Sequence, residues 1–184
     1  MKTLIIGGAR SGKSALAESL AQATGLEVVV IVTAQALDAE MAARIAQHQA
    51  QRPAGWRTVE APLDLTATLR AVDAPGRLLL VDCLTLWLSN HLAPQSVGQG
   101  EGDAAEWAPA TEAAQAAVAE LVACVAGLQA EVLLIGNEVG HGIVPLGPLS
   151  RVFVDENGRL HQRLAAVCER VRFVMAGCAL ALKG

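Results

Sequence analysis

Thr3-Leu-Ile-Ile-Gly-Gly-Ala-Arg-Ser-Gly-Lys-Ser14 is a short apolar run that leads into a glycine-rich turn. Residues 7–14 fit the pattern G-x-x-x-x-G-K-[ST] of a phosphate-binding loop, or P-loop. Glycines let such a loop turn tightly and bring its N–H groups against phosphate oxygens. The helix that follows directs the positive end of its dipole at the same anion. This stretch therefore predicts a strand, a nucleotide-binding loop and a helix, in that order.

Individual residues of the loop have separate expected roles. Lys13 would reach the β- and γ-phosphates as a mobile cation, and the Ser14 hydroxyl would ligate Mg²⁺. A glycine-rich turn without a ligand is the alternative, but the β-branched strand before the motif and the helix-forming Ala15–Thr24 after it favour a true P-loop. The expected contacts to the nucleotide are Gly7, Gly8, Ala9, Arg10, Ser11, Gly12, Lys13 and Ser14.

Short apolar runs and amphipathic stretches alternate along the rest of the chain. The runs are Leu4–Ile6, Val28–Val32, Leu78–Val81, Val132–Ile135 and Val171–Met175. Helices are expected at about 14–24, 38–50, 62–72, 110–129 and 158–169. Non-alternating Val, Ile and Leu are typical of strands covered on both faces. The sequence predicts an α/β fold of the P-loop NTPase type, with a mostly parallel central sheet and helices on both faces.

Chain length and the C-terminal residues complete the fold prediction. At 184 residues the chain is expected to form a single nucleotide-binding domain over residues 1–184. Gly177 separates the last apolar run from a second short strand at Ala179–Leu182. This pattern predicts a short antiparallel hairpin at the edge of the sheet.

Composition limits the class of protein. Hydrophobic residues make up 53% of the chain and charged residues 17%, which indicates a globular protein. A formal net charge of −4 argues against a general nucleic-acid binder. The four cysteines are scattered without metal-ligand spacing, as expected for buried thiols in a reducing compartment. With no signal peptide and no expected membrane span, we expect a cytoplasmic protein.

Asp82 ends the buried run Leu78–Val81 and is the candidate partner of Ser14 in a metal site. In P-loop proteins an acid at the carboxyl end of a neighbouring strand holds Mg²⁺ directly or through water. An Asp in this position could instead cap a turn or the next helix. The P-loop earlier in the chain favours the metal role.

A histidine lies on the predicted helix at 38–50. Glu40, Arg44 and His48 recur at helical spacing and share one face, which by itself is typical of a solvated surface. A neutral imidazole can also attack phosphorus and form a phosphoramidate. Arg44, one turn away, would disfavour the protonated ring and help keep it neutral.

The chain resembles the bifunctional adenosylcobinamide kinase / adenosylcobinamide-phosphate guanylyltransferase family of cobalamin biosynthesis over essentially its whole length. The P-loop alone is generic, whereas the His48 segment together with Asn137-Glu-Val-Gly140 and Gly142-Ile-Val-Pro145 makes the match specific. The remaining matching residues are Thr33-Ala34, Leu37–Ile45, Arg52-Pro53, Trp56-Arg-Thr58, Glu60, the strand ending at Asp82, Gly158-Arg-Leu160 and Gln162-Arg-Leu-Ala165.

The resemblance implies two reactions. Adenosylcobinamide would first be phosphorylated with ATP or GTP; GTP would then guanylylate His48, pyrophosphate would leave, and GMP would pass to adenosylcobinamide phosphate. It also implies a homotrimer. The family's further nucleotide contacts correspond to Thr33, Ala34, Gln49, Ala50, Gln51, Arg52, Glu60 and Asp82.

Two residues depart from the family pattern, and two other functions compete with it. His141 stands where an apolar residue is commoner and His161 where asparagine is usual; we expect both to be structural or neutral. Another small-molecule P-loop kinase is the nearest alternative, although the glycine-rich loop at 93–103 lacks the arginines of many kinase lids. A nucleotide-driven switch protein is a third possibility. A covalent GMP adduct would distinguish the family function from both.

Overall fold

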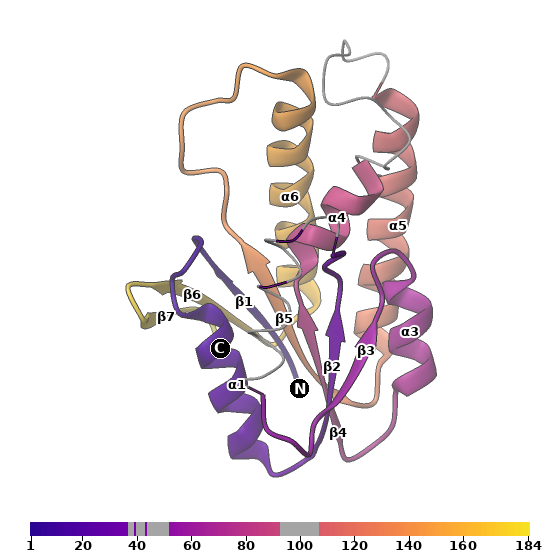
Figure 1. Cartoon of the computed structure of the whole chain (residues 1–184), viewed down its shortest axis with the longest axis vertical. Coiled ribbons are helices and arrows are strands. Elements are labelled where there is room, and N and C mark those ends of the chain that lie inside the picture. The colour runs from indigo at the N-terminus through magenta and orange to yellow at the C-terminus, as the bar shows by residue number, and fades with distance from the viewer. Residues whose placement is uncertain (37–38, 40–42, 44–51, 93–106) are drawn as a thin grey trace.

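The computed structural model describes residues 1–36, 39, 43, 52–92 and 107–184, which form strands and helices in alternation (Figure 1). Their bounds are β1 Lys2–Gly7, α1 Lys13–Thr24, β2 Glu27–Val32, β3 Arg57–Glu60, α3 Leu65–Val72, β4 Arg77–Asp82, α4 Leu84–Leu92, α5 Ala108–Gly127, β5 Glu131–Asn137, α6 Pro148–Val167, β6 Arg170–Met175 and β7 Cys178–Lys183.

The strands form one seven-stranded sheet in the order β3-β2-β4-β5-β1-β6-β7. All neighbouring pairs are parallel except β6 and β7, which form an antiparallel hairpin at the edge. Gly7 at the end of β1 lies opposite Asn137 of β5 and Val174 of β6. The predicted α/β architecture, its parallel sheet and its C-terminal edge hairpin are confirmed.

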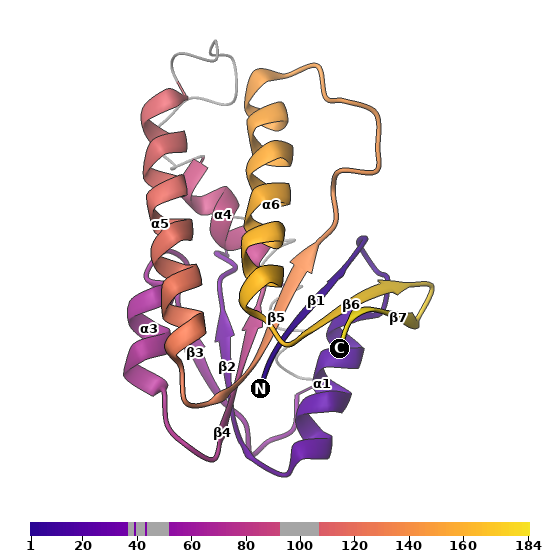
Figure 2. The same cartoon turned by 180° about the vertical axis from the view of Figure 1, so that it is seen from behind.

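The two faces of the sheet bury different sets of side chains, as the period of a strand requires. Ile5, Val28 and Val30 pack with Ala17 and Ala21 of α1 on one face. The opposite residues of the same strands pack against α3, α4, α5 and α6 on the other face. Figure 2 shows α5 and α6 side by side across that second face. Helices therefore cover both faces, as predicted.

Three elements differ from the sequence prediction. β3 was not predicted, because Arg57–Glu60 is a short, mostly exposed edge strand without an apolar run. α4 was not predicted, because its leucines and Trp87 are buried on several sides and show little amphipathic pattern. α6 was predicted to begin at residue 158 but begins at Pro148, ten residues earlier. Gly158, where the helix was expected to begin, lies inside it.

Two further predictions can be compared with the described residues. The helix expected at 38–50 lies almost wholly outside them; only Ala39 and Ala43 are described, and both are helical. By length and composition alone α5 could cross a membrane, although it carries Glu112 and Glu120. In this structure α5 places Val118, Leu121 and Val125 in the core of the protein.

Candidate nucleotide site

The candidate site lies where the parallel strands end. The connection after β1 leads to α1 on one face, and the connection after its neighbour β5 leads to α6 on the other (Figure 1). Ligands of open parallel sheets bind outside the carboxyl ends of strands at such a switch of direction. The Glu138 N–H donates to the Gly7 carbonyl at 3.0 Å, so the chain leaving β5 is attached to the first residue of the P-loop.

Backbone geometry explains the glycines of the loop. A Cβ on Gly7 would lie 2.4 Å from the Val174 carbonyl oxygen, so no larger residue fits beside β6. Gly12 has φ +98°, a conformation that side chains rarely adopt, and it immediately precedes α1. The Lys13 ammonium donates to the Gly8 carbonyl at 3.1 Å and is thereby held over the loop.

The turn between β6 and β7 braces the P-loop. The Gly177 N–H donates to the Ser11 carbonyl at 2.8 Å, and a Cβ on Gly12 would lie 3.1 Å from the Gly177 Cα. The Ser11 hydroxyl is buried and has no hydrogen-bond partner among the described residues. The turn of the edge hairpin therefore contacts and supports the P-loop at Ser11 and Gly12. The sequence did not indicate this role.

Charges gather around Lys13 and Asp82. Burial lowers the pKa of Lys13, while Cys83 and the Asp82 carboxylate oppose that shift. Burial raises the pKa of the neighbouring Cys83 thiol to about 11, and Asp82 adds to the effect. Near neutral pH the thiol is thus uncharged, and the site consists of a cation, a carboxylate and the amides of the loop.

Thr33 holds the segment that carries Asp82. Its side chain is fully buried; the hydroxyl donates to the Cys83 carbonyl at 2.6 Å and accepts the Cys83 N–H at 3.0 Å. Its backbone N–H donates to the Asp82 carbonyl at 3.2 Å. Asn90 of α4 in turn donates to the Thr33 carbonyl at 2.9 Å. Both hydrogen bonds of the hydroxyl are therefore made to the backbone of Cys83, next to Asp82.

Arg52, which precedes β3 in the sequence, lies beside Asp82 at the end of β4. Its Nη2 lies 3.4 Å from Asp82 Oδ2, and the two side chains are 6% and 19% exposed. Its second amino group, Nη1, is buried without a partner among the described residues. The adjacent expected contacts Gln49, Ala50 and Gln51, and the histidine His48, lie outside the described residues.

The remaining expected contacts lie further from the loop. Ala34 is half-buried and directly follows Thr33. Glu60 is exposed at the end of β3, the outermost strand on that side. Since β3 is four strands from β1, strand spacing alone separates Glu60 from Gly7 by about 19 Å. Glu60 can reach a bound nucleotide only at a part remote from the phosphates gripped by the loop.

Ser14 and Asp82 are the residues that could hold a magnesium ion. Mg²⁺ takes oxygen ligands and usually keeps several waters beside one or two protein groups and substrate phosphates. A hydroxyl in the first turn of α1 and a carboxylate close enough to influence the Lys13 pKa suit that donor set. No cluster of three or more His, Cys, Asp or Glu side chains occurs in the described ranges, so a closed protein-only metal cage is not seen there.

Asn137 and His161 are two further residues near the site. Asn137 donates its N–H to the Thr85 hydroxyl at 2.6 Å and accepts Asn157 Nδ2 at 3.0 Å, so it joins β5 to α4 and α6. The His161 ring occupies the space where a side chain on Gly136 would stand, 2.3 Å from its Cβ position. Burial lowers the pKa of His161, which keeps the ring neutral near pH 7. The expected structural role of His161 agrees with this packing.

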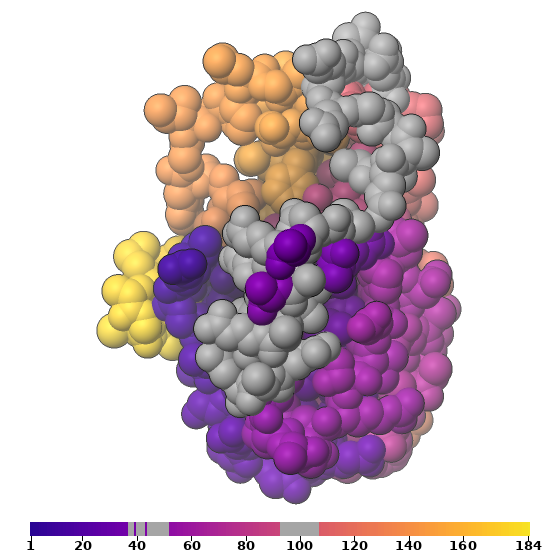
Figure 3. Space-filling model, viewed as in Figure 1, coloured from indigo at the N-terminus to yellow at the C-terminus, as the bar shows by residue number. Residues whose placement is uncertain are grey.

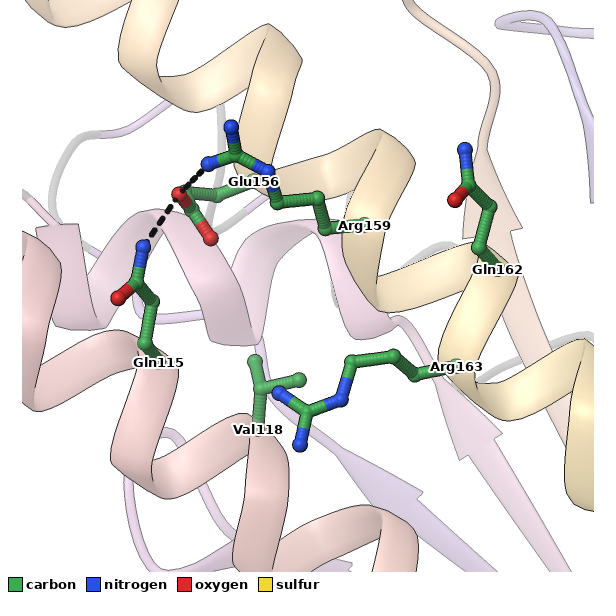
Figure 4. Close-up of a pocket in the computed structure, with 6 residues that line it drawn as sticks. All are labelled: Gln115, Val118, Glu156, Arg159, Gln162 and Arg163. Atoms are coloured by element: carbon green, nitrogen blue, oxygen red, sulfur yellow. Dashed lines mark hydrogen bonds and ion pairs between the residues drawn. The ribbon is translucent and has the colours of Figure 1, made fainter.

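A separate groove lies between α5 and α6, on the face opposite α1 (Figure 4). Glu156 is buried there and accepts hydrogen bonds from Gln115 of α5, at 2.8 Å, and from Arg159 of its own helix. Figure 4 shows Gln115 and Arg159 converging on the same carboxylate. These polar groups satisfy one another, so we interpret them as a tie between two helices.

Three comparisons place the chain among known proteins. The family model described as cobinamide kinase / cobinamide phosphate guanyltransferase matches residues 3–182. The bifunctional adenosylcobalamin biosynthesis protein CobP of Pseudomonas aeruginosa is 52% identical, over 100% of this chain and 98% of its own length. The corresponding protein CobU of Salmonella typhimurium is 42% identical, over 100% of both chains.

One solved structure supports the fold alone. A protein studied as project PH0250 from Pyrococcus horikoshii superposes with a TM-score of 0.51 at 10% identity, over 100% of this chain and 86% of that one. The curated relatives instead match at high identity from end to end. The chain belongs to the cobinamide kinase / cobinamide phosphate guanyltransferase family.

Proposed function

We propose that this protein phosphorylates adenosylcobinamide with ATP or GTP and then transfers GMP from GTP to adenosylcobinamide phosphate, giving adenosylcobinamide-GDP and pyrophosphate. The observation that carries the proposal is full-length membership of the family together with a formed P-loop whose Lys13 and Asp82 lie in one charged cluster. The names of both relatives describe bifunctional proteins of adenosylcobalamin biosynthesis.

In the kinase step the protein's task is to position the reactants and neutralise charge. The loop Gly7–Ser14 would hold the triphosphate through its backbone N–H groups, and the dipole of α1 points at the same place. Lys13 would move from the Gly8 carbonyl to the β- and γ-phosphates. Ser14 and Asp82 would hold Mg²⁺, which when bound neutralises phosphate charge.

In the transferase step we assign the nucleophile to His48. Attack of a neutral ring nitrogen on the α-phosphorus forms the P–N bond as the bond to pyrophosphate breaks. A phosphate oxygen of adenosylcobinamide phosphate then attacks the same phosphorus. The new P–O bond forms as the P–N bond to the histidine breaks. His48 precedes Arg52 by four residues, and an extended chain spans at most about 14 Å over that distance. Arg52 contacts Asp82, and its closeness to His48 in the sequence supports this assignment.

The other expected nucleotide contacts divide into two groups. Arg52 and Asp82 belong to the charged cluster and would act on the phosphates and their metal. Ala34 follows β2, Glu60 ends the neighbouring strand β3, and both would face the nucleoside part. Thr33 would contribute through its backbone position, because its hydroxyl already bonds to Cys83.

Assembly into a homotrimer is part of the proposal. The arm formed by residues 138–147 exposes Ile143 and Leu146 almost completely, at 97% and 96%. Met175, Leu180 and Leu182 of the β6–β7 hairpin are also exposed. Figure 3 shows the arm in orange and the hairpin in yellow along the same side of the molecule. Exposed apolar groups on one side favour contact with another subunit.

We also propose a cytoplasmic location. All four cysteines are free thiols, and three of them are buried, which fits a reducing compartment.

The direct test supplies purified protein with adenosylcobinamide, GTP and Mg²⁺ and follows the products by chromatography and mass spectrometry. We expect adenosylcobinamide phosphate to appear first and adenosylcobinamide-GDP next. Lys13→Ala should lower both rates by about a hundredfold or more, because an electrostatic contact to the transferring phosphate is lost. Unchanged rates in Lys13→Ala, or an absence of the GDP product with the wild-type protein, would contradict the proposed function.

A further inference from the structure

Arg52 occupies an unusual position for a charged side chain. Its guanidinium is almost fully buried, yet its contact with the Asp82 carboxylate is single and long, Nη2 to Oδ2 at 3.4 Å. A well-formed pair between these groups is shorter and commonly uses two parallel N–H donors. Nη1 is buried and makes no hydrogen bond within the described part of the chain. Among the described residues, the Arg52 guanidinium is thus held at the site by one long contact only.

The same carboxylate also serves a second cation. Lys13 lies close enough to Asp82 to interact with it, so the ammonium and the guanidinium share one carboxylate. The three side chains Lys13, Arg52 and Asp82 together therefore carry an excess of positive charge.

This excess of positive charge disfavours binding of a free divalent cation but not of a cation that is already bound to a triphosphate. A free metal ion at Asp82 would add to the positive charge and compete with Arg52 for the same oxygen. A metal ion that arrives on a triphosphate brings more negative than positive charge and also supplies oxygens for Nη1. The guanidinium can then turn from the carboxylate to a phosphate, for which its planar fork is well suited.

We propose that Arg52 is the resident counter-ion of Asp82 and competes with the divalent metal, so that the metal enters this site only together with the nucleotide. The inference rests on the proposed function, because it takes a metal–nucleoside triphosphate as the ligand. Arg52 is accordingly a positioning residue that acts through Asp82, the carboxylate proposed to bind the metal. When the Arg52 guanidinium leaves Asp82 and binds a phosphate, the carboxylate becomes available to the metal, which couples nucleotide binding to metal binding.

The test measures binding of Mn²⁺, a paramagnetic substitute for Mg²⁺, to the nucleotide-free protein by electron paramagnetic resonance of the free ion. Arg52→Gln and Arg52→Met each remove the charge, and the longer apolar Met suits a buried position. Both should bind Mn²⁺ at least about fivefold more tightly than wild type, since a charge about 4 Å away has that effect even through water. Arg52→Lys keeps the charge and should stay near the wild-type affinity.

Matched controls separate this effect from general charge removal. Arg57→Gln removes an exposed charge at the start of β3 and should change the Mn²⁺ affinity by less than about twofold. In an Asp82→Asn background, Arg52→Gln should give no gain. Circular dichroism and thermal melting show which variants are folded, and the two neutral substitutions provide separate chances of a folded protein.

A second measurement tests the coupling. A GTP analogue with a methylene bridge between the α- and β-phosphates cannot transfer GMP, so binding can be measured without turnover. The factor by which the analogue tightens Mn²⁺ binding should be smaller in Arg52→Gln than in wild type. The factor by which Mn²⁺ tightens binding of the analogue should decrease by the same amount.

The proposal is overturned if the neutral Arg52 variants bind Mn²⁺ no more tightly than wild type, or if the gain survives in Asp82→Asn. Because the first measurement contains no nucleotide, its outcome is independent of whether GMP transfer occurs. Loss of GMP transfer with an intact Mn²⁺ difference would count against the proposed function and leave the ion competition standing.

Discussion

At the scale of single residues, the site is organised around Asp82. Lys13 and Arg52 lie close enough to interact with its carboxylate, and Thr33 fixes the Asp82 carbonyl and the backbone of the next residue, Cys83. Groups that orient a metal ligand commonly change metal affinity or activity by about 10–100-fold when removed. The roles of Thr33 and Arg52 are thus distinguishable: one supports the carboxylate and the other competes for it.

Replacing Thr33 with Val keeps the shape of the side chain but removes its hydroxyl. The buried Cys83 N–H and C=O would lose their partner, so we expect a loss of about 1–3 kcal/mol in the free energy of unfolding. The Mg²⁺ concentration for half-maximal kinase activity should rise by about tenfold or more. Urea unfolding and Mg²⁺ titrations of the initial rate measure the two effects.

Thr33→Ser is the matched control, because it keeps the hydroxyl. It should recover most of the Mg²⁺ dependence even if it is somewhat less stable. A Val variant with wild-type Mg²⁺ dependence, or a Ser variant as impaired as Val, would show that Thr33 does not act through Asp82.

At the scale of secondary-structure elements, the continuity of α6 through Gly158 is directly testable. A Cβ at Gly158 meets nothing within 4 Å, and the residue lies inside the helix Pro148–Val167. Gly158→Ala should therefore stabilise the protein by about 0.5–1 kcal/mol, as expected for an open helical position. Thermal and urea unfolding measure the change.

Gly136 provides the opposite case on the strand that faces α6. A Cβ there would lie 2.3 Å from His161 Nε2, so Gly136→Ala should destabilise by about 1–3 kcal/mol, the usual cost of overpacking a core. If Gly158→Ala destabilises by as much as Gly136→Ala, the helix is not continuous at residue 158.

The elements also show what the sequence could predict. Buried strands such as β2 and β4 are continuous Val, Ile and Leu runs, and such runs identified the parallel sheet. β3 lacks that signal because its side chains are mostly exposed, and α4 lacks an amphipathic pattern because it is buried on several sides. α6 was expected to begin at residue 158, but packing of Leu149, Val152 and Phe153 against the core accompanies an earlier start at Pro148.

The site was predictable to the extent that its chemistry is local in sequence. Gly7–Ser14 form one continuous motif, and Asp82 ends an apolar strand, so both could be recognised without a structure. The pairing of Thr33 with Cys83 joins residues 50 apart, and that of Arg52 with Asp82 joins residues 30 apart. Such contacts depend on the strand order β2-β4, which a single sequence does not contain.

At the scale of the whole molecule, the homotrimer can be tested through its exposed apolar side. Sedimentation equilibrium should give three times the chain mass of 19.1 kDa. Replacing Ile143 and Leu146 with charged residues should dissociate the assembly if the arm forms the contact. Leu20→Glu, at an exposed apolar position on α1, is the control and should leave the assembly intact. A wild-type protein that sediments as a single chain would contradict the trimer.

The central claim is that one P-loop presents the α-phosphate of GTP to His48. The most direct measurement incubates the protein with GTP labelled at the α-phosphate and looks for acid-labile label on the chain, locating it by mass spectrometry. We expect one GMP per chain attached at His48, none in His48→Ala, and release of the label as adenosylcobinamide-GDP when adenosylcobinamide phosphate is added. Label that persists in His48→Ala, or a wild-type protein that makes the product without ever carrying label, would contradict this account.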